Sequence, residues 1–258
     1  MRDRYARHVA VDGFGPVGHA ALRATSAAVD ATADRDAAVV AATFLAASGV
    51  AALAVTAGEP ELADVVAHGR DTTFSTTAPA TAAVPITATL SPAWWPLPEP
   101  SAADAMYRGA VAATAAMLAA REQLRAAVAA IADHARAAYP RECCGFVVAS
   151  AAGLHAIRCE NVATAADAYA FADADVLTFV RSLDSPAPAR LVYHSHPNGR
   201  AYFSDRDRAV AATPAGPVYP VGHLVVGIDD TGPREAAVYT YDPATAGYTE
   251  VARFALPC

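Results

Sequence analysis

Two histidines at the end of a short apolar run constrain this chain more than any other feature. The run covers residues 191–193 (Leu-Val-Tyr), continues through His194 and His196, and stops at Pro197. A short apolar run that ends at a proline is typical of a buried strand. Because successive side chains of a strand point to opposite faces, both imidazoles are expected on the same face. The sequence therefore predicts a strand that carries two metal-ligand side chains on one side.

A third ligand follows on a predicted helix. Ser204 begins a pattern that predicts a helix through Ala212, and Asp207 then lies in the first turn of that helix. Catalytic zinc takes three protein ligands from His and Asp or Glu, and it leaves the fourth position for water. His194, His196 and Asp207 meet that count. Helix capping is the alternative explanation for Ser204 and Asp207, because both residue types favour the start of a helix.

Amide hydrolysis also needs a proton carrier and a donor for the oxyanion. Zinc lowers the pKa of water toward about 7, but a base must accept the proton and pass it to the leaving amine. Glu142, which precedes the apolar run at residues 144–149, is the candidate for this general acid/base. Ser204 offers a hydroxyl as the oxyanion donor. Residues 142–207 therefore indicate a single-zinc hydrolase site.

These residues together resemble a known family. Glu142, the run His-Ser-His-Pro at 194–197, six further residues, Ser204, two residues and Asp207 look like the full signature of the JAMM (MPN-plus) zinc peptidases. The resemblance implies a cytidine-deaminase-like α/β domain over residues 119–258, with one Zn²⁺ per chain held by the two histidines and Asp207. It also implies that Glu142 is the general acid/base and that Ser204 stabilises the oxyanion.

The beginning of the chain resembles a second family. Residues 4–8 (Arg-Tyr-Ala-Arg-His) and the glycines behind them are similar to the start of the adenylating enzymes that activate ubiquitin-like and sulfur-carrier proteins. Residues 26–29 then fall where the first strand of those enzymes begins, and residues 45–55 fall where a crossover helix leads into the second strand. The resemblance implies a small Rossmann-like domain at residues 1–118. An unrelated alanine-rich helical domain is the alternative.

This N-terminal domain is expected to be degenerate. In the same register the glycines of the phosphate-binding turn would fall near Thr32, Asp34 and Ala37, so none of them is retained. Thr56 stands in the place of the acidic ribose ligand, and neighbouring aspartates add negative charge where phosphates would sit. We therefore expect no bound nucleotide. The domain is expected to serve dimerisation or the holding of a carrier protein.

The segment between the two predicted domains has a composition of its own. Residues 78–100 are rich in Thr, Ala and Pro, which predicts a loop or linker. Residues 101–138 carry apolar side chains at helical spacing without an interior proline, which predicts one long helix or two abutting helices. We place the domain boundary near residue 118, within this helical segment.

Charge and hydropathy restrict the class of protein. The chain has 258 residues, a formal net charge of -7 and no cluster of Lys and Arg, which argues against a nucleic-acid partner. The most apolar stretch, residues 44–55, is too short to span a bilayer, so we expect a cytoplasmic protein with no membrane partner.

The other potential metal-binding or nucleophilic side chains are expected to be structural. The cysteines have no CxxC spacing, and reduced, mostly buried thiols are expected at Cys143, Cys144, Cys159 and Cys258. The histidines outside the motif have no second ligand at useful spacing, which leaves structural or surface roles for His8, His19, His68, His134, His155 and His223.

The two resemblances together suggest a zinc peptidase or isopeptidase that cuts after the C-terminus of a ubiquitin-like or sulfur-carrier protein, with a homodimer through the N-terminal domain. Residues 132–148 also look like peptidases of tailed-phage assembly, which leaves the substrate open. A non-catalytic MPN-type scaffold or carrier-binding module is the alternative from another class, although such relatives generally lose ligands. A zinc deaminase is rejected, because the paired cysteine ligands of a PCxxC motif are absent from the sequence.

Overall fold

The structure is a computed structural model of the chain, and it describes residues 14–30, 35–50, 52–56, 73–75, 82–84, 102–150, 152–243 and 245–256. The chain divides into two compact units. One comprises Met1–Glu122 with Ser150–Gly153, and the other comprises Gln123–Ala149 with Leu154–Cys258. The division at Glu122 and the predicted boundary near residue 118 both fall within a single helix, α5 (Ala102–Ala138).

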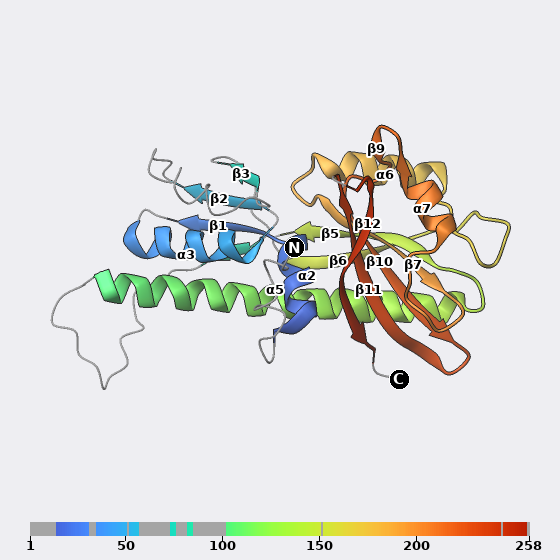
Figure 1. Cartoon of the computed structure of the whole chain (residues 1–258), viewed down its shortest axis with the longest axis horizontal. Helices are drawn as coiled ribbons and strands as arrows, with labels where there is room; N and C mark the ends of the chain where they lie inside the picture. Colours follow the sequence, from blue (N-terminus) through green and yellow to red (C-terminus); the bar gives the residue numbers. More distant parts are fainter. Residues whose placement is uncertain are drawn as a thin grey trace. The chain divides into compact units, whose positions relative to one another are not determined.

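Parallel strands form the sheet of the first unit, in the order β3-β2-β1-β4 (Figure 1). Strand β1 (Ser26–Asp30) leads through helix α3 (Arg35–Ser48) into β2 (Ala52–Thr56), which is the crossover that a parallel pair requires. These elements lie where the sequence placed a first strand and a crossover. The unit also contains α2 (Gly15–Ala24), β3 (Thr73–Ser75) and β4 (Ala82–Val84).

Strand β4 corrects one expectation. The sequence predicts a loop or linker throughout residues 78–100, but residues 82–84 pair in parallel with β1. These residues, Ala-Ala-Val, contain none of the prolines of the segment, so each of their backbone N–H groups is available to a strand ladder. The other residues of this segment lie outside the part of the chain that the structure describes.

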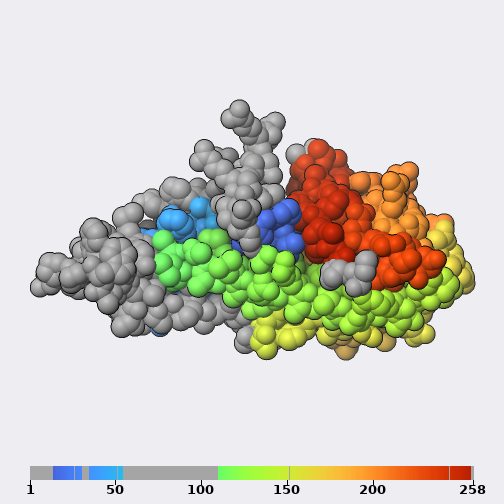
Figure 2. Space-filling model, turned by 90° about the horizontal axis from the view of Figure 1, so that it is seen from below, coloured from blue at the N-terminus to red at the C-terminus, as the bar shows by residue number. Residues whose placement is uncertain are grey.

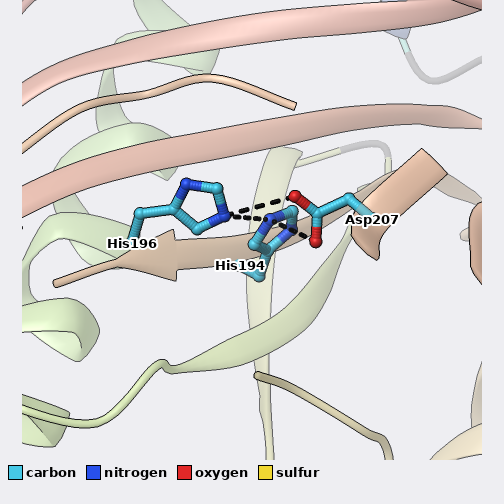
Figure 3. Close-up of side chains that lie close together, drawn as sticks. All are labelled: His194, His196 and Asp207. Atoms are coloured by element: carbon cyan, nitrogen blue, oxygen red, sulfur yellow. Dashed lines mark hydrogen bonds and ion pairs between the residues drawn. The ribbon is translucent and has the colours of Figure 1, made fainter. Parts of the chain in front are cut away.

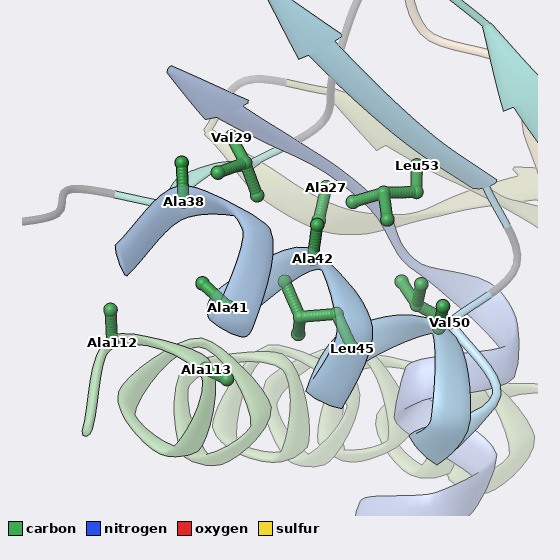
Figure 4. Close-up of a cluster of buried hydrophobic side chains, with 11 residues drawn as sticks. Ala27, Val29, Ala38, Ala41, Ala42, Leu45, Val50, Leu53, Ala112 and Ala113 are labelled. Carbon is green, nitrogen blue, oxygen red and sulfur yellow. The ribbon is translucent and has the colours of Figure 1, made fainter. Parts of the chain in front are cut away.

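Small apolar side chains form the core of the first unit. Helix α3 lies between the sheet and α5, and its buried face consists largely of alanine (Figure 4). Alanine favours the helix and lets the backbones of neighbouring elements approach closely. The larger members are also fully or almost fully buried, and they are Val29, Leu45, Val50 and Leu53. The alanine bias of the composition is therefore compatible with a packed core.

Helix α5 is one continuous helix of 37 residues, which resolves the choice that the sequence left open. Its alanine-rich sequence has no interior proline, and the helix ends immediately before Tyr139 and Pro140. Exposed residues recur every three or four positions from Ala115 to Ala137 and form one solvent-facing stripe. The green atoms of Figure 2 show this helix at the surface. Among the described residues, no helix is long and apolar enough to cross a membrane.

A mixed six-stranded sheet is the centre of the second unit, in the order β12-β11-β10-β7-β5-β6 (Figure 1). Strands β7 and β10 are parallel, whereas β5 with β7, β10 with β11, and β11 with β12 are antiparallel. The bounds are β5 (Cys144–Ser150), β6 (Gly153–Cys159), β7 (Ala189–His196), β10 (Gly222–Asp229), β11 (Gly232–Asp242) and β12 (Gly247–Ala255). The strands predicted at 144–149, 191–193 and 223–228 are confirmed, and so is the α/β class of this region.

Helices cover both faces of this sheet. On one face Tyr193 of β7 is hydrogen-bonded through its hydroxyl to Nδ1 of His134 in α5, at 2.9 Å. On the other face Val192 packs in a cluster with Phe179 of α6 (Asp173–Leu183). Helix α7 (Asp205–Ala211) lies on that second face too, through Ala211, and the short strands β8 (Ala212–Thr213) and β9 (Gly216–Pro217) follow it. His194 and His196 share the face of Val192, because they alternate with Tyr193.

Candidate metal centre

Two imidazoles and a carboxylate converge at the end of β7 (Figure 3). Nε2 of His194 and Nε2 of His196 are 3.1 Å apart. Oδ1 of Asp207 lies 3.4 Å from Nε2 of His194, and Oδ2 lies 3.3 Å from Nε2 of His196. All three residues are buried. The structure thus brings together the three residues that the sequence predicts as ligands, with both histidines on one face of the strand.

The spacing of these atoms fits a tetrahedral metal ion. Zinc bonds to His nitrogen and carboxylate oxygen are about 2.0–2.2 Å long, so ligand atoms at the corners of a tetrahedron are about 3.4 Å apart. The two Nε2 atoms are 3.1 Å apart, and each has a different oxygen of the carboxylate at 3.3 or 3.4 Å, so the separations are close to that value. Among the described residues, Nδ1 of His194 and Nδ1 of His196 have no hydrogen-bond partner. The three residues could therefore hold zinc through two Nε2 atoms and the carboxylate.

The start of α7 places the carboxylate. Ser204 is the N-cap, and its Oγ accepts a hydrogen bond from the backbone N–H of Asp207 at 3.1 Å. The carboxylate of Asp207 in turn accepts from the backbone N–H of Ser204, which completes a capping box. The carboxylate of Asp207 therefore takes part in the helix cap and also lies against the two histidine rings. The cap therefore fixes the rotamer of Asp207 that faces the two rings.

Electrostatics favour the protonation states that a metal requires. Burial lowers the pKa of His194, which favours the neutral imidazole that binds metals. Burial raises the pKa of Asp207, but hydrogen bonds with the His194 and His196 rings and with Ser204 outweigh it. The pKa of Asp207 is therefore held well below its usual range, and the side chain is a carboxylate at neutral pH.

Glu142 lies beside this group, in the connection between α5 and β5. Its Oε1 is 3.9 Å from Nε2 of His196, and the side chain is buried. Burial, followed by the negative charges of Asp207 and Asp167, raises the pKa of Glu142 to about 8. A cation held by the three ligands would lower that pKa again through its positive charge. Glu142 therefore lies where a general acid/base of this site would have to lie, and its carboxyl group holds its proton to a higher pH than an exposed glutamate does.

A cavity of about 480 Å³ opens beside the candidate metal centre. Glu142, His196 and Ser204 contribute to its wall. The hydroxyl proton of Ser204 is not available to a molecule in the cavity, because its Oγ donates a hydrogen bond to Oδ2 of Asp207 at 2.6 Å. On the rim, Arg206 donates from Nη1 to the backbone oxygen of Asp167 at 2.8 Å. The cavity is therefore bounded by β7, by α7 and by the segment around residue 167.

That segment, residues 161–171, contains contributors to the site that the sequence does not reveal. The ring of Tyr169 stacks on His194, with centroids 4.4 Å apart and an angle of 17° between the planes. Asn161 donates from Nδ2 to the backbone oxygen of Glu142 at 2.8 Å. No periodic pattern or spacing marks either residue. An asparagine two residues after the end of a strand is itself only a turn signal.

Among the residues that the structure describes, the other histidines and cysteines form no second centre. Within the described part of the chain, His194, His196 and Asp207 are the one group of metal-ligating side chains that converges. His134 is hydrogen-bonded to Tyr193, while His19 and His223 are buried. Three cysteines are free and buried, as the sequence predicts, and they are Cys143, Cys144 and Cys159. The predictions for His8, His68 and Cys258, like those for Thr32 and Asp34, concern residues outside the part of the chain that the structure describes.

Residues 124–239 match the family described as "Prokaryotic homologs of the JAB domain". This part of the chain is a prokaryotic JAB domain of the JAMM/MPN class, and it contains Glu142, Ser204 and the three converging side chains. No curated protein matches the chain. The chain is similar to a protein from Salinibacter ruber (strain DSM 13855) whose solution structure is known. The two sequences are 21% identical over a match that covers 49% of this chain and 84% of the Salinibacter chain. Its TM-score of 0.33 is too low to define a shared fold.

Proposed function

We propose that this chain is a zinc-dependent peptidase or isopeptidase that hydrolyses the amide bond after the C-terminus of a ubiquitin-like or sulfur-carrier protein. The observation that carries this proposal is the convergence of two imidazoles and a carboxylate beside a buried glutamate, within a JAB domain. Three ligands of this kind leave one coordination position open, which is the arrangement of catalytic rather than structural zinc sites. A cytidine-deaminase-like arrangement of the mixed sheet and its helices is part of the proposal.

The chain's own residues supply the proton transfers. When bound, zinc provides Lewis acidity, which polarises a carbonyl and makes water nucleophilic at neutral pH. Glu142 accepts a proton from the attacking water at a carboxylate oxygen and delivers it to the nitrogen of the leaving amine. Ser204 donates a hydrogen bond to the oxyanion, which requires its hydroxyl to turn away from Asp207. His194, His196 and Asp207 hold the metal.

Metal analysis and a cleavage assay test this function. We expect about one zinc per chain, and hydrolysis of a peptide that ends in Gly-Gly with a fluorogenic coumarin amide. Glu142→Gln is expected to keep its zinc and to lose roughly 100-fold or more in kcat, as for the loss of a general acid/base. Glu122→Gln on the exposed face of α5 is the matched control and should cleave like the wild type. A Glu142→Gln variant that cleaves as fast as the wild type would contradict the assignment.

For the first unit, we propose a catalytically silent relative of the adenylating enzymes, which serves homodimerisation or holds the carrier protein. The parallel order β3-β2-β1-β4 supports this, because many dinucleotide-binding folds begin with the strand order 3-2-1-4. Ala37, at one position of a missing phosphate-loop glycine, is fully buried in α3. Titration with ATP is expected to show no binding. A micromolar affinity would contradict a silent domain.

A further inference from the structure

The side chain of Asn161 uses its full hydrogen-bonding capacity on backbone groups around the proposed acid/base. Its Nδ2 donates to the backbone oxygen of Glu142 at 2.8 Å and to that of Ala168 at 2.9 Å. Its Oδ1 accepts from the backbone N–H of Ala163 at 3.0 Å and from that of Ala170 at 3.1 Å. An amide side chain has two N–H donors and one oxygen with two lone pairs, so all four positions are occupied.

These bonds fix the backbone of Glu142 from both sides. The residue lies between α5 and β5, where no helix or strand ladder satisfies its peptide groups. Its C=O accepts from Asn161, and its N–H donates to the backbone oxygen of Ala166 at 3.0 Å. Both partners belong to residues 161–171, which we name the clasp segment. A buried peptide group needs such partners, so the clasp segment sets where Glu142 can lie.

The clasp segment also reaches the metal ligands and the cavity. Tyr169 stacks on the His194 ring, and Asp167 receives the hydrogen bond from Arg206 on the cavity rim. A bridge between Asn161 and Phe171 closes the ends of the segment on each other. Because the four bonds of Asn161 tie residues within this loop to Glu142, one side chain links the acid/base to the wall of the cavity. The loop has no helix or strand of its own to do so.

We propose that Asn161 is a positioning residue, which holds the carboxylate of Glu142 at the distance from the metal ligands that proton transfer requires. The inference rests on the proposed function, since it assigns Glu142 as the acid/base. Asn161 itself does not touch the reacting atoms. Its loss should leave His194, His196 and Asp207 able to bind zinc, and should let the Glu142 backbone move. A misplacement of about 1 Å can cost on the order of 100-fold in rate.

Two substitutions separate this role from a general loss of structure. Asn161→Asp keeps the volume and the acceptor for Ala163 and Ala170, but it removes the donors to Glu142 and Ala168. Asn161→Ala removes all four bonds without adding a charge. Ser150→Ala is the matched control, because Ser150 caps the turn at the opposite end of the β5–β6 hairpin through bonds to Ala152 and Gly153. It has no bond to the clasp segment.

The experiment is a double-mutant cycle on the full chain, with the Gly-Gly coumarin amide as the probe. Each Asn161 variant is expected to lower kcat by about 10- to 100-fold with a change in KM below about 3-fold. In the Glu142→Gln background the same substitutions should lower the residual rate by less than about 2-fold, because the positioned group is already gone. Zinc content and the cobalt absorption spectrum should match the wild type. Ser150→Ala should retain the wild-type kcat.

The outcomes separate this inference from the proposed function. If the wild type cleaves and Glu142→Gln does not, the proposed function holds. Wild-type kcat in both Asn161 variants then overturns the positioning role, and so does an equal loss of rate in the presence and absence of Glu142. Loss of zinc from either variant overturns it as well, because the role would then be support of the metal centre. If neither the wild type nor Glu142→Gln differs from buffer, the proposed function itself fails.

Discussion

The phenol ring of Tyr169 lies nearly parallel to the imidazole of His194, with their centroids 4.4 Å apart. His194 is fully buried, and its Nδ1 has no hydrogen-bond partner among the described residues. Many metal-ligating histidines are oriented by a hydrogen bond to the second ring nitrogen. Here the stacked ring restricts the orientation of the imidazole instead. The contact between these two side chains therefore restrains one of the three residues of the candidate metal centre.

Replacement of Tyr169 should weaken metal binding. Tyr169→Leu removes the stacked ring, and we expect zinc affinity to fall by about 10-fold, as for other groups that orient a ligand. Tyr169→Phe keeps the ring and should bind zinc within about 2-fold of the wild type. Competition with a fluorescent zinc chelator measures both. An unchanged affinity in Tyr169→Leu would show that β7 alone orients His194.

Ala201, in the connection between His196 and Ser204, is held by a separate network. Its N–H donates to Glu235 at 2.8 Å, and its C=O accepts from Arg253 at 2.8 Å. Arg253→Met should lower the free energy of unfolding by roughly 1–2 kcal/mol, because it removes a charge-assisted hydrogen bond to a buried peptide group. Urea unfolding measures the change. Arg136→Met, which breaks only an exposed pair on α5, is the control and should cost less than about 0.5 kcal/mol.

The sequence predicts the convergence of the candidate metal ligands because their placement follows from local periodicity. An alternation of two puts His194 and His196 on one face of β7, and a capping box puts Asp207 at the start of α7. Each rule concerns residues only a few positions apart. The strands of the second unit could be predicted for the same reason, since apolar runs bounded by turn residues are local signals.

The clasp segment could not be predicted, because its order comes from tertiary contacts. Asn161 follows β6 and bonds to Glu142, which precedes β5, so the contact lies at the open end of the β5–β6 hairpin. Tyr169 likewise contacts His194, which is 25 positions further along the chain. Neither contact leaves a periodic pattern in the sequence. Strand β4 could not be predicted for a related reason. Its three residues lie between prolines, and they form a strand because they pair with β1. Tertiary context outweighs local composition at these places.

His223 makes the stability of the second unit decrease at acidic pH. It is buried among aromatic rings, and neither ring nitrogen has a hydrogen-bond partner among the described residues. Burial, and then His194, lower its pKa to about 3. An unfolded histidine titrates near about 6.5, so the unfolded state binds more protons between these two values. The contribution of neutral His223 to the free energy of unfolding is therefore fully present above about pH 6.5. It is lost as the pH falls, by up to about 1.4 kcal/mol per pH unit.

His223→Leu should therefore reduce the acid sensitivity. Between pH 6.5 and pH 5.0 the variant is expected to lose about 2 kcal/mol less than the wild type. At pH 7.5 it should be at least as stable, since it buries no unsatisfied polar atom. Urea unfolding in excess chelator at these pH values measures both differences. Parallel pH dependences in the two proteins would show that His223 is already protonated or solvated in the folded state.

Gly227 permits the close packing of the segment that follows the second histidine. A Cβ atom on Gly227 would lie 2.6 Å from backbone atoms of Arg200 and Gly199, closer than a real contact allows. The same backbone is held to β10 by a hydrogen bond from the N–H of Gly199 to the oxygen of Ile228 at 2.8 Å. A side chain at position 227 would therefore push this segment away from the sheet.

Gly227→Ala should accordingly impair both stability and catalysis. The clash involves backbone rather than a flexible side chain, so we expect a loss of roughly 1–3 kcal/mol in the free energy of unfolding. The displaced segment leads from His196 to Ser204, and kcat should fall by about 10-fold or more as the start of α7 shifts. Gly247→Ala is the control, because its nearest neighbour would be the Thr245 oxygen at 3.8 Å. Equal stability and kcat in the two variants would show that the segment can move without disturbing Asp207.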